Sequence, residues 1–306
     1  MEKEDFTVKY RDMFPDLRDT VDSDLEKCQL IMLRLLRIFD DICRRHGLSY
    51  WLGGGTLLGA ARHKGFIPWD DDLDVSMPRA DYERFFKIGL AELPEDIFLQ
   101  HMDTEDRYMY FMRLRDNYST YREEKNVSGV HNGIRLDIFP FDHYRIPEKL
   151  IFPLSKALTA VLLDEFSIGK YNTRKKFKTL RKLRYAAARM PSFFLSARAR
   201  KKIFASISAL VTTEDTKGPF FVGLEGCQRK YRRVDPTDVF PLTEIMFEGY
   251  SFMAPRNVPK YLTDLYGDYN EIPDITERMI HSSVISPYES CGHPRSLHWQ
   301  DKRKEQ

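Results

Sequence analysis

The sequence has few cysteines, and none of them are closely paired. Its 306 residues contain four: Cys28, Cys43, Cys227 and Cys291. Closely spaced cysteines are typical of disulfide frameworks and of structural zinc sites. The cluster of Cys291, His293 and His298 lacks the further acidic or thiol partner that a zinc site needs. We therefore expect free thiols in a reducing compartment.

The sequence also lacks a long apolar run. The most apolar segment, "FPLSKALTAVLLDEF" at 152–166, carries Lys156, Asp164 and Glu165, and it falls short of the ~18 uncharged residues of a membrane span. The N-terminal "MEKEDFTVKYRDMF" is charged and has no apolar core, so we expect no signal peptide. These features predict a soluble, cytoplasmic protein.

An excess of one charge is missing as well. The chain has 48 Lys and Arg against 46 Asp and Glu, a net charge of +2, so nucleic acid is not an expected partner. With 42% hydrophobic and 13% aromatic residues, the composition is that of a globular protein. The length allows one elaborated domain or two small ones.

The hydrophobic pattern predicts an α+β protein, a mixed sheet flanked by helices. An apolar stripe at three- and four-residue steps predicts a helix over 23–46, which Ser23 caps and Gly47 ends. A second helix is expected from near Thr56, and a third over 79–93. Aromatic and β-branched residues predict strands at the following segments: 48–54, 73–77, 97–101, 107–115 and 134–139.

Composition divides the chain into three parts. We expect a catalytic core over 1–145, a basic helical insertion over 146–235, and a C-terminal segment over 236–306 that packs back on the core. Residues 170–202 hold thirteen Lys or Arg interleaved with apolar residues. The insertion is expected either to contact an anionic membrane surface or lipid-linked acceptor at the inner face of the membrane, or to form a lid with a solvated basic face.

Four aspartates stand within five residues, at positions 70, 71, 72 and 74. In a strand, Asp70, Asp72 and Asp74 would share one face, and carboxylates two residues apart, ~7 Å along the backbone, can converge on one cation. Oxygen ligands without His or Cys favour Mg²⁺ or Mn²⁺. A third acid, Asp137, lies among apolar residues in "IRLDIFPF", where it is costly unless paired or metal-bound. The alternatives are a solvated acidic loop and, for Asp137, an ion pair with Arg113, Arg115 or Arg135.

Three glycines precede the aspartates and predict an anion site. Gly54 and Gly55 allow close backbone approach, and Thr56 begins a helix whose free N–H groups attract phosphate. Arg62, His63 and Lys64 follow on the same helix and can neutralise more phosphate charge, unless they form an ordinary solvated helix end. A phosphate cradle beside carboxylates that bind a divalent metal is suited to a metal-bound diphosphate.

Three segments together resemble the LicD family, which includes phosphocholine transferases and is related to fukutin and fukutin-related protein. They are "YWLGGGTLLGAARHKGFIPWDDDLDVSMPRADYERF", "GIRLDIFPFD" and "LYGDYNEIP". The resemblance implies a nucleotidyltransferase-like fold in which Gly55 and Thr56 match the turn signature. It also implies that Asp72 and Asp74 are the acid pair and Asp137 the third acid.

The resemblance further implies transfer of a phospho-alcohol, phosphocholine foremost, from a CDP-linked donor such as CDP-choline. The acceptor would be a hydroxyl of a cell-surface glycan, a lipid-linked glycan, or a teichoic acid or lipopolysaccharide precursor, and CMP would be released. Asp137 would also accept the hydroxyl proton, while Asp70 and Asp71 would tune the field or order water. Two alternatives stay open: nucleotidyl transfer that releases pyrophosphate, and a non-catalytic glycan- or nucleotide-binding module.

Overall fold

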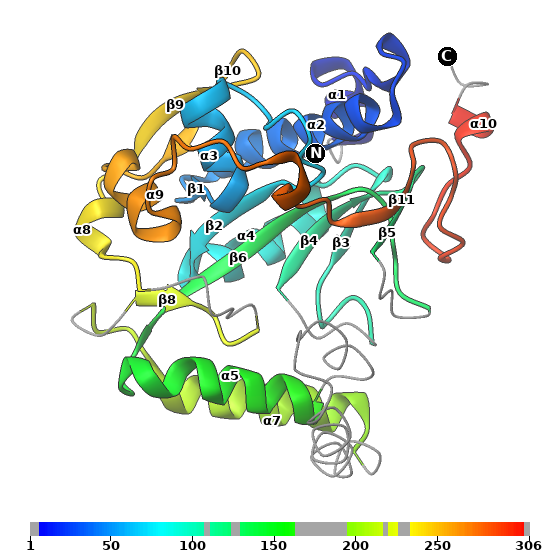
Figure 1. The fold of residues 1–306 in the computed structure, drawn as a ribbon. Helices are drawn as coiled ribbons and strands as arrows, with labels where there is room; N and C mark the ends of the chain where they lie inside the picture. The colour runs from blue at the N-terminus through cyan, green and yellow to red at the C-terminus, as the bar shows by residue number, and fades with distance from the viewer. Residues whose placement is uncertain are drawn as a thin grey trace, which may run out of the picture.

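The computed structural model describes residues 6–106, 111–123, 129–162, 195–216, 220–225 and 233–302. Figure 1 shows a central sheet with helices against it and a C-terminal segment that crosses in front. The predicted α+β class, a mixed sheet with helices, is confirmed. Within the described residues, no helix is both long and apolar enough to cross a bilayer.

The longer helices agree closely with the sequence pattern. The helix predicted over 23–46 is α2, whose Ser23 and Glu26 form a reciprocal capping box and whose Gly47 adopts a left-handed C-cap. The helix expected from Thr56 begins two residues earlier, at Gly54. The described helices are α1 (Phe6–Met13), η1 (Arg18–Thr20), α2 (Asp24–His46), α3 (Gly54–His63), α4 (Arg79–Glu92), α5 (Glu148–Leu162), α7 (Ala197–Val211), α8 (Pro236–Val239), α9 (Val258–Tyr266), η4 (Ile275–Glu277) and α10 (Trp299–Lys302).

The main sheet mixes parallel and antiparallel pairs in the order β1-β2-β6-β4-β3, with β7 and β8 paired to the far end of β6. Strands β9 and β10 form a separate hairpin, and β11 pairs with β5. The described strands are β1 (Trp51–Leu52), β2 (Asp74–Pro78), β3 (Ile97–Gln100), β4 (Met112–Asp116), β5 (Thr120–Glu123), β6 (Arg135–Tyr144), β7 (Thr212–Thr213), β8 (Phe220–Val222), β9 (Thr243–Phe247), β10 (Tyr250–Ala254) and β11 (Ser282–Ser286).

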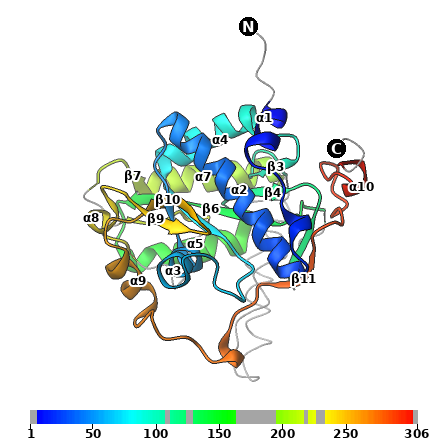
Figure 2. The ribbon, with the colours of Figure 1, turned by 90° about the horizontal axis from the view of Figure 1, so that it is seen from above.

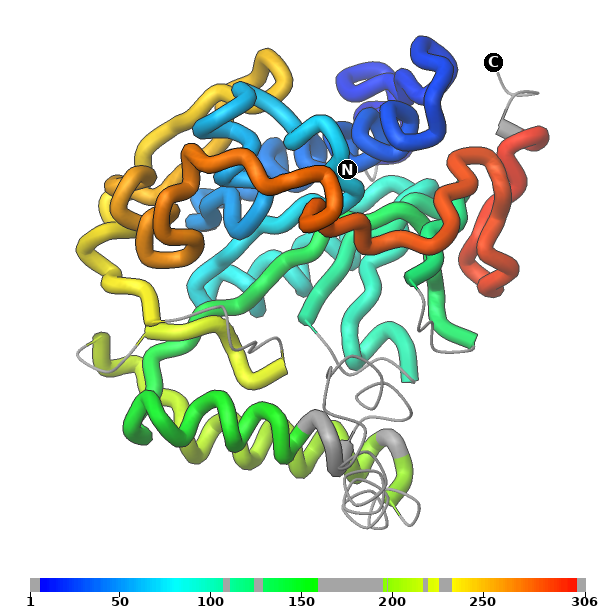
Figure 3. The backbone as a smooth tube through the Cα atoms, viewed as in Figure 1, coloured from blue at the N-terminus to red at the C-terminus, as the bar shows by residue number. Residues whose placement is uncertain are grey.

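Helices α2 and α4 cover one face of the sheet, where both contact β6; Figure 2 shows α2 lying across it. Alternation along β6 turns Leu136 and Ile138, both fully buried, toward the core. Asp137 and Phe139 therefore point to the opposite face. Figure 3 shows the chain after α9 crossing in front of this second face before it reaches β11.

The three-part division of the chain stays a prediction. Strand β8, at 220–222 within the predicted insertion, pairs with β6 of the core sheet. Of the basic segment, the structure describes α5 and α7, which pack on each other. Within the basic stretch over 170–202, which was expected to contact a membrane surface or form a lid, residues 170–194 lie outside the described residues.

Candidate active site

Three carboxylates from two segments of the chain converge on one point. Asp72, Asp74 and Asp137 each offer an oxygen, and these oxygens all lie within 4.8 Å of one another. Asp74 opens β2, and it stands opposite Asp137 of the parallel strand β6. The structure thus brings together the three acids that the sequence predicted as metal ligands.

The geometry of the aspartate run differs from the predicted strand alternation. Strand β2 begins only at Asp74, so Asp70 and Asp72 lie in the preceding loop, and the prediction that all three share one face of a strand was wrong. The Asp70 N–H donates to the Ile67 carbonyl at 2.8 Å, closing a turn through Pro68, which cannot donate to a sheet ladder. Asp72 reaches the cluster from this loop.

The glycine turn fits closely around Asp74. The Gly53 N–H donates to the Asp74 carbonyl at 3.0 Å, and the Asp74 N–H donates to Thr56 Oγ1 at 2.8 Å. Gly54 has a φ of +45°, and a Cβ there would lie 2.6 Å from Asp74 Oδ2. Only glycine therefore admits the carboxylate against the start of α3. Gly55 and Thr56 line the cleft described below.

Asp74 is a buried acid whose surroundings disfavour its charged form. Burial, and then the negative charges of Asp72, Asp137 and Asp70, raise its pKa well above the usual value. No hydrogen-bond donor among the described residues reaches its buried Oδ1. Burial, and then the negative charges of Asp72 and Asp71, raise the pKa of Asp70 to about 8. A buried carboxylate oxygen without a donor, beside two other carboxylates, suits a cation ligand.

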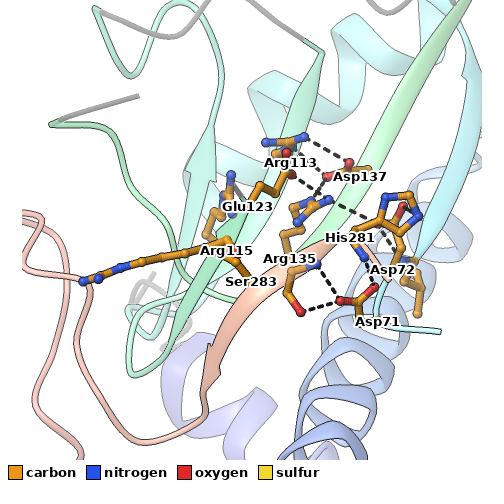
Figure 4. A network of polar contacts seen from close by, with 12 residues as sticks. Asp71, Asp72, Arg113, Arg115, Glu123, Arg135, Asp137, His281 and Ser283 are labelled. Carbon is orange, nitrogen blue, oxygen red and sulfur yellow. Dashed lines mark hydrogen bonds and ion pairs between the residues drawn. The ribbon is translucent and has the colours of Figure 1, made fainter. Parts of the chain in front are cut away.

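Asp137 has the opposite surroundings. Burial alone would raise its pKa, but Arg113 and Arg135 outweigh burial, so the pKa is lowered. Arg113 Nε lies 2.7 Å from Asp137 Oδ1, and Arg135 Nε lies 3.0 Å from the same oxygen. The alternative interpretation, an ion pair with an arginine, is therefore correct in part: Asp137 is both paired and a member of the acid cluster (Figure 4).

Asp71 joins a different contact. Its carboxylate accepts from the backbone N–H of His281 at 2.9 Å, and from the N–H and hydroxyl of Ser282. Burial would raise the pKa of Asp71, but these donors lower it below the usual value. Asp71 thus attaches β11 to the acidic loop (Figure 4). The sequence contains no signal for this contact, since its partners lie far along the chain.

The basic residues predicted to hold phosphate divide between two environments. Arg62 lines the cleft, but its Nη1 donates to the carbonyls of Tyr269 and Glu271 at 3.1 and 3.2 Å. His63 Nε2 lies 3.0 Å from Arg62 Nε, and Lys64 caps the helix in the left-handed conformation. His63 and Lys64 are not among the residues that line the cleft. Arg62 therefore fastens the loop after α9 to the end of α3.

The acids open into a cleft of about 1010 Å³, large enough for a nucleotide-sized ligand. The end of α9 and the loop after it form another wall with Tyr266, Asp268 and Tyr269, from the segment "LYGDYNEIP". Trp69 lines the cleft with the Arg278 guanidinium 3.9 Å from its ring, whereas Tyr82 is buried in the core. The lining residues that sequence reasoning did not place in the site include Phe111, Glu123, Phe139, Tyr266, Arg278 and His281.

Comparison with known proteins identifies the family. Lipopolysaccharide cholinephosphotransferase LicD of Haemophilus influenzae is 32% identical over 261 residues, 84% of this chain and 95% of that protein. The chain belongs to the LicD family. The model of this family, described as LicD/FKTN/FKRP, nucleotidyltransferase domain, matches residues 47–162, which include the glycine turn and the three acids of the cluster.

A second relative matches a much smaller part of the chain. The mouse ribitol 5-phosphate transferase FKRP is 61% identical over 95 residues, which are 31% of this chain and 17% of that protein. The two named relatives thus transfer different phospho-alcohols. Membership in the LicD family therefore leaves the transferred alcohol open.

Proposed function

We propose that this LicD-family protein transfers a phospho-alcohol, phosphocholine foremost, from a CDP-linked donor to a hydroxyl of a cell-surface glycan or its lipid-linked precursor. The named relatives, a cholinephosphotransferase acting on lipopolysaccharide and a ribitol 5-phosphate transferase, support this class of reaction. In the reaction, the acceptor oxygen bonds to the phosphorus that carries the alcohol. The bond from that phosphorus to the CMP oxygen breaks, CMP leaves, and the hydroxyl proton passes to solvent water.

One observation carries the proposal: three carboxylates meet beside the N-terminus of α3, inside a cleft large enough for a nucleotide. Carboxylates this close repel one another unless a cation lies between them. Among the described residues, no donor reaches the buried Oδ1 of Asp74, so this oxygen is suited to a positive ligand. Gly55 and Thr56 begin α3 beside them, where free N–H groups attract phosphate. This combination suits a metal-bound diphosphate and supports a nucleotidyltransferase-like fold for the core.

Asp72, Asp74 and Asp137 would hold Mg²⁺ or Mn²⁺, since the site offers only carboxylate oxygens. When bound, such an ion stabilises charge on the leaving CMP and lowers the pKa of the attacking hydroxyl. The arginines beside Asp137 keep its carboxylate ionised, which supports a ligand role more than that of a proton acceptor. Tyr266 and Tyr269 offer aromatic rings at the cleft for a quaternary ammonium group, whereas the Arg278 guanidinium already lies over the Trp69 ring.

The released product tests the proposal. Incubation with CDP-choline, CDP-ribitol or CDP-glycerol, a glycan acceptor and Mg²⁺ should yield CMP with at least one donor. Release of pyrophosphate from a nucleoside triphosphate instead would replace this proposal with nucleotidyl transfer. Titration calorimetry should show that binding of a donor requires Mg²⁺ or Mn²⁺. Equal affinity in excess chelator would contradict the metal-bound diphosphate.

A further inference from the structure

Arg135 lies between two of the three clustered acids (Figure 4). Its Nε lies 3.0 Å from Asp137 Oδ1, and its Nη2 lies 3.4 Å from Asp72 Oδ1. One guanidinium thus joins an acid of β6 to an acid of the loop before β2. The side chain is almost completely buried, with 5% of it exposed.

Strand β5 fixes the position of this guanidinium. Arg135 Nη2 also lies 3.0 Å from Glu123 Oε1, and the guanidinium carbon lies 4.4 Å from the centre of the Tyr121 ring. Tyr121 and Glu123 both belong to β5, which β11 pairs and holds. A planar guanidinium held by stacking and by a carboxylate keeps its direction, because its fork of donors is rigid.

The neighbouring Arg113 differs from Arg135 in position. It pairs with Asp137 from β4, through Nε–Oδ1 at 2.7 Å and Nη2–Oδ2 at 3.2 Å, and its side chain is 16% exposed at the cleft. Removing either arginine takes one positive charge from beside the acids. Removing Arg135 also breaks the link between Asp72 and Asp137. The two residues therefore separate a charge effect from a positioning effect.

We propose that Arg135 is a positioning residue that holds Asp72 and Asp137 in the arrangement that binds the cation. This inference rests on the proposed function, since it concerns the same metal site. Asp72 needs such a link because it lies in a loop outside the sheet ladder, whereas Asp74 and Asp137 are fixed by strand pairing. A guanidinium next to a cation site also repels the cation, so positioning must outweigh that repulsion.

Titration calorimetry of the full chain with Mn²⁺ alone tests whether Arg135 positions the acids. Arg135→Gln should lower Mn²⁺ affinity by ~10–100-fold, the usual effect of losing a residue that orients metal ligands. Arg135→Lys keeps the charge and most of the stem but loses the planar fork, and it should also bind Mn²⁺ more weakly. Arg135→Lys carries the test if Arg135→Gln does not fold.

Arg113→Gln is the comparison for charge: it also removes a positive partner of Asp137 but leaves the link to Asp72, so it should lose less Mn²⁺ affinity than Arg135→Gln. Unchanged or tighter binding by folded Arg135 variants would overturn the inference, since a structural or purely repulsive arginine gives those results. An equal loss in Arg113→Gln would also overturn it, because the link to Asp72 would then have no special part. Wild-type protein that binds no Mn²⁺ would instead remove the metal from the proposed function, and this inference with it.

Discussion

Asp74 and Asp137 stand directly opposite one another on the parallel strands β2 and β6, yet their surroundings shift their pKa values in opposite directions. Burial and neighbouring carboxylates raise the pKa of Asp74. Arg113 and Arg135 overcome the effect of burial and lower the pKa of Asp137. The two acids of one cluster therefore differ in what they contribute to the stability of the metal-free protein.

The asparagine variants should separate these contributions. At pH 7 in chelator, Asp74→Asn should raise the free energy of unfolding by about 1 kcal/mol, because folding raises the pKa of Asp74 at a cost in stability that asparagine does not have. Asp137→Asn should lower it by about 3 kcal/mol, because it leaves two arginines without their buried partner. Urea unfolding of both variants checks this, and a loss of stability in Asp74→Asn would contradict the assigned charge repulsion.

The pH dependence of the same variants has a definite sign. The folded pKa of Asp74 is raised, so the wild type should lose stability as pH rises from the unfolded pKa toward the folded one. The advantage of Asp74→Asn should therefore shrink as pH falls toward about 4. Asp137 has a lowered folded pKa, so its contribution is present above the unfolded pKa and is lost as pH falls through the folded one. Unfolding curves at a series of pH values measure both trends.

Metal binding should release protons. Asp70, with a pKa of about 8, and Asp74, with a strongly raised pKa, hold protons near pH 7 when no metal is bound. A cation favours the ionised carboxylates, so Mn²⁺ binding should expel protons and strengthen as pH rises. Calorimetry in two buffers of different ionisation enthalpy measures the release. Identical heats in both buffers would show that the acids are already ionised.

Gly54→Ala should damage the site more than the fold. Gly54 and Gly47 both have positive φ, and alanine at either position costs about 1–2 kcal/mol of strain. Only at Gly54 does the added Cβ meet Asp74, at 2.6 Å from Oδ2, whereas nothing lies within 4 Å at Gly47. We expect Gly54→Ala to lose at least tenfold in Mn²⁺ affinity and Gly47→Ala to bind like the wild type. Equal affinities would show that the Asp74 carboxylate moves aside without effect.

Asp71→Asn should loosen β11. Asparagine keeps one acceptor oxygen, so its NH2 group would face the N–H of either His281 or Ser282, and a donor left without an acceptor there costs about 1–3 kcal/mol. Hydrogen exchange of these two amides should become faster, with Asp72→Asn as the control that keeps both hydrogen bonds. Unchanged protection in Asp71→Asn would mean that the pairing of β11 with β5 holds the segment by itself.

The sequence predicted those features that depend on residues close together in the chain. The capping box of Ser23 and Glu26 and the glycine end of α2 involve residues a few positions apart, so their pattern is visible in the chain. The i, i+2 spacing of Asp72 and Asp74 predicted an acid pair for the same reason, and the structure brings the two carboxylates together, although the extended strand assigned to Asp70 and Asp72 was wrong. The turn through Pro68 precedes the strand, and β2 begins only at Asp74, later than the alternation suggested.

The sequence by itself determined the α+β composition, the long amphipathic helix and the local acid and glycine motifs, because these depend on spacing along the chain. Only the tertiary structure decided that Asp137 faces Asp74, that Asp71 holds Ser282, and that Arg135 joins Asp72 to Asp137. Those contacts link segments far apart in sequence. Their partners are selected by strand order and by the packing of the whole core, which no local pattern encodes.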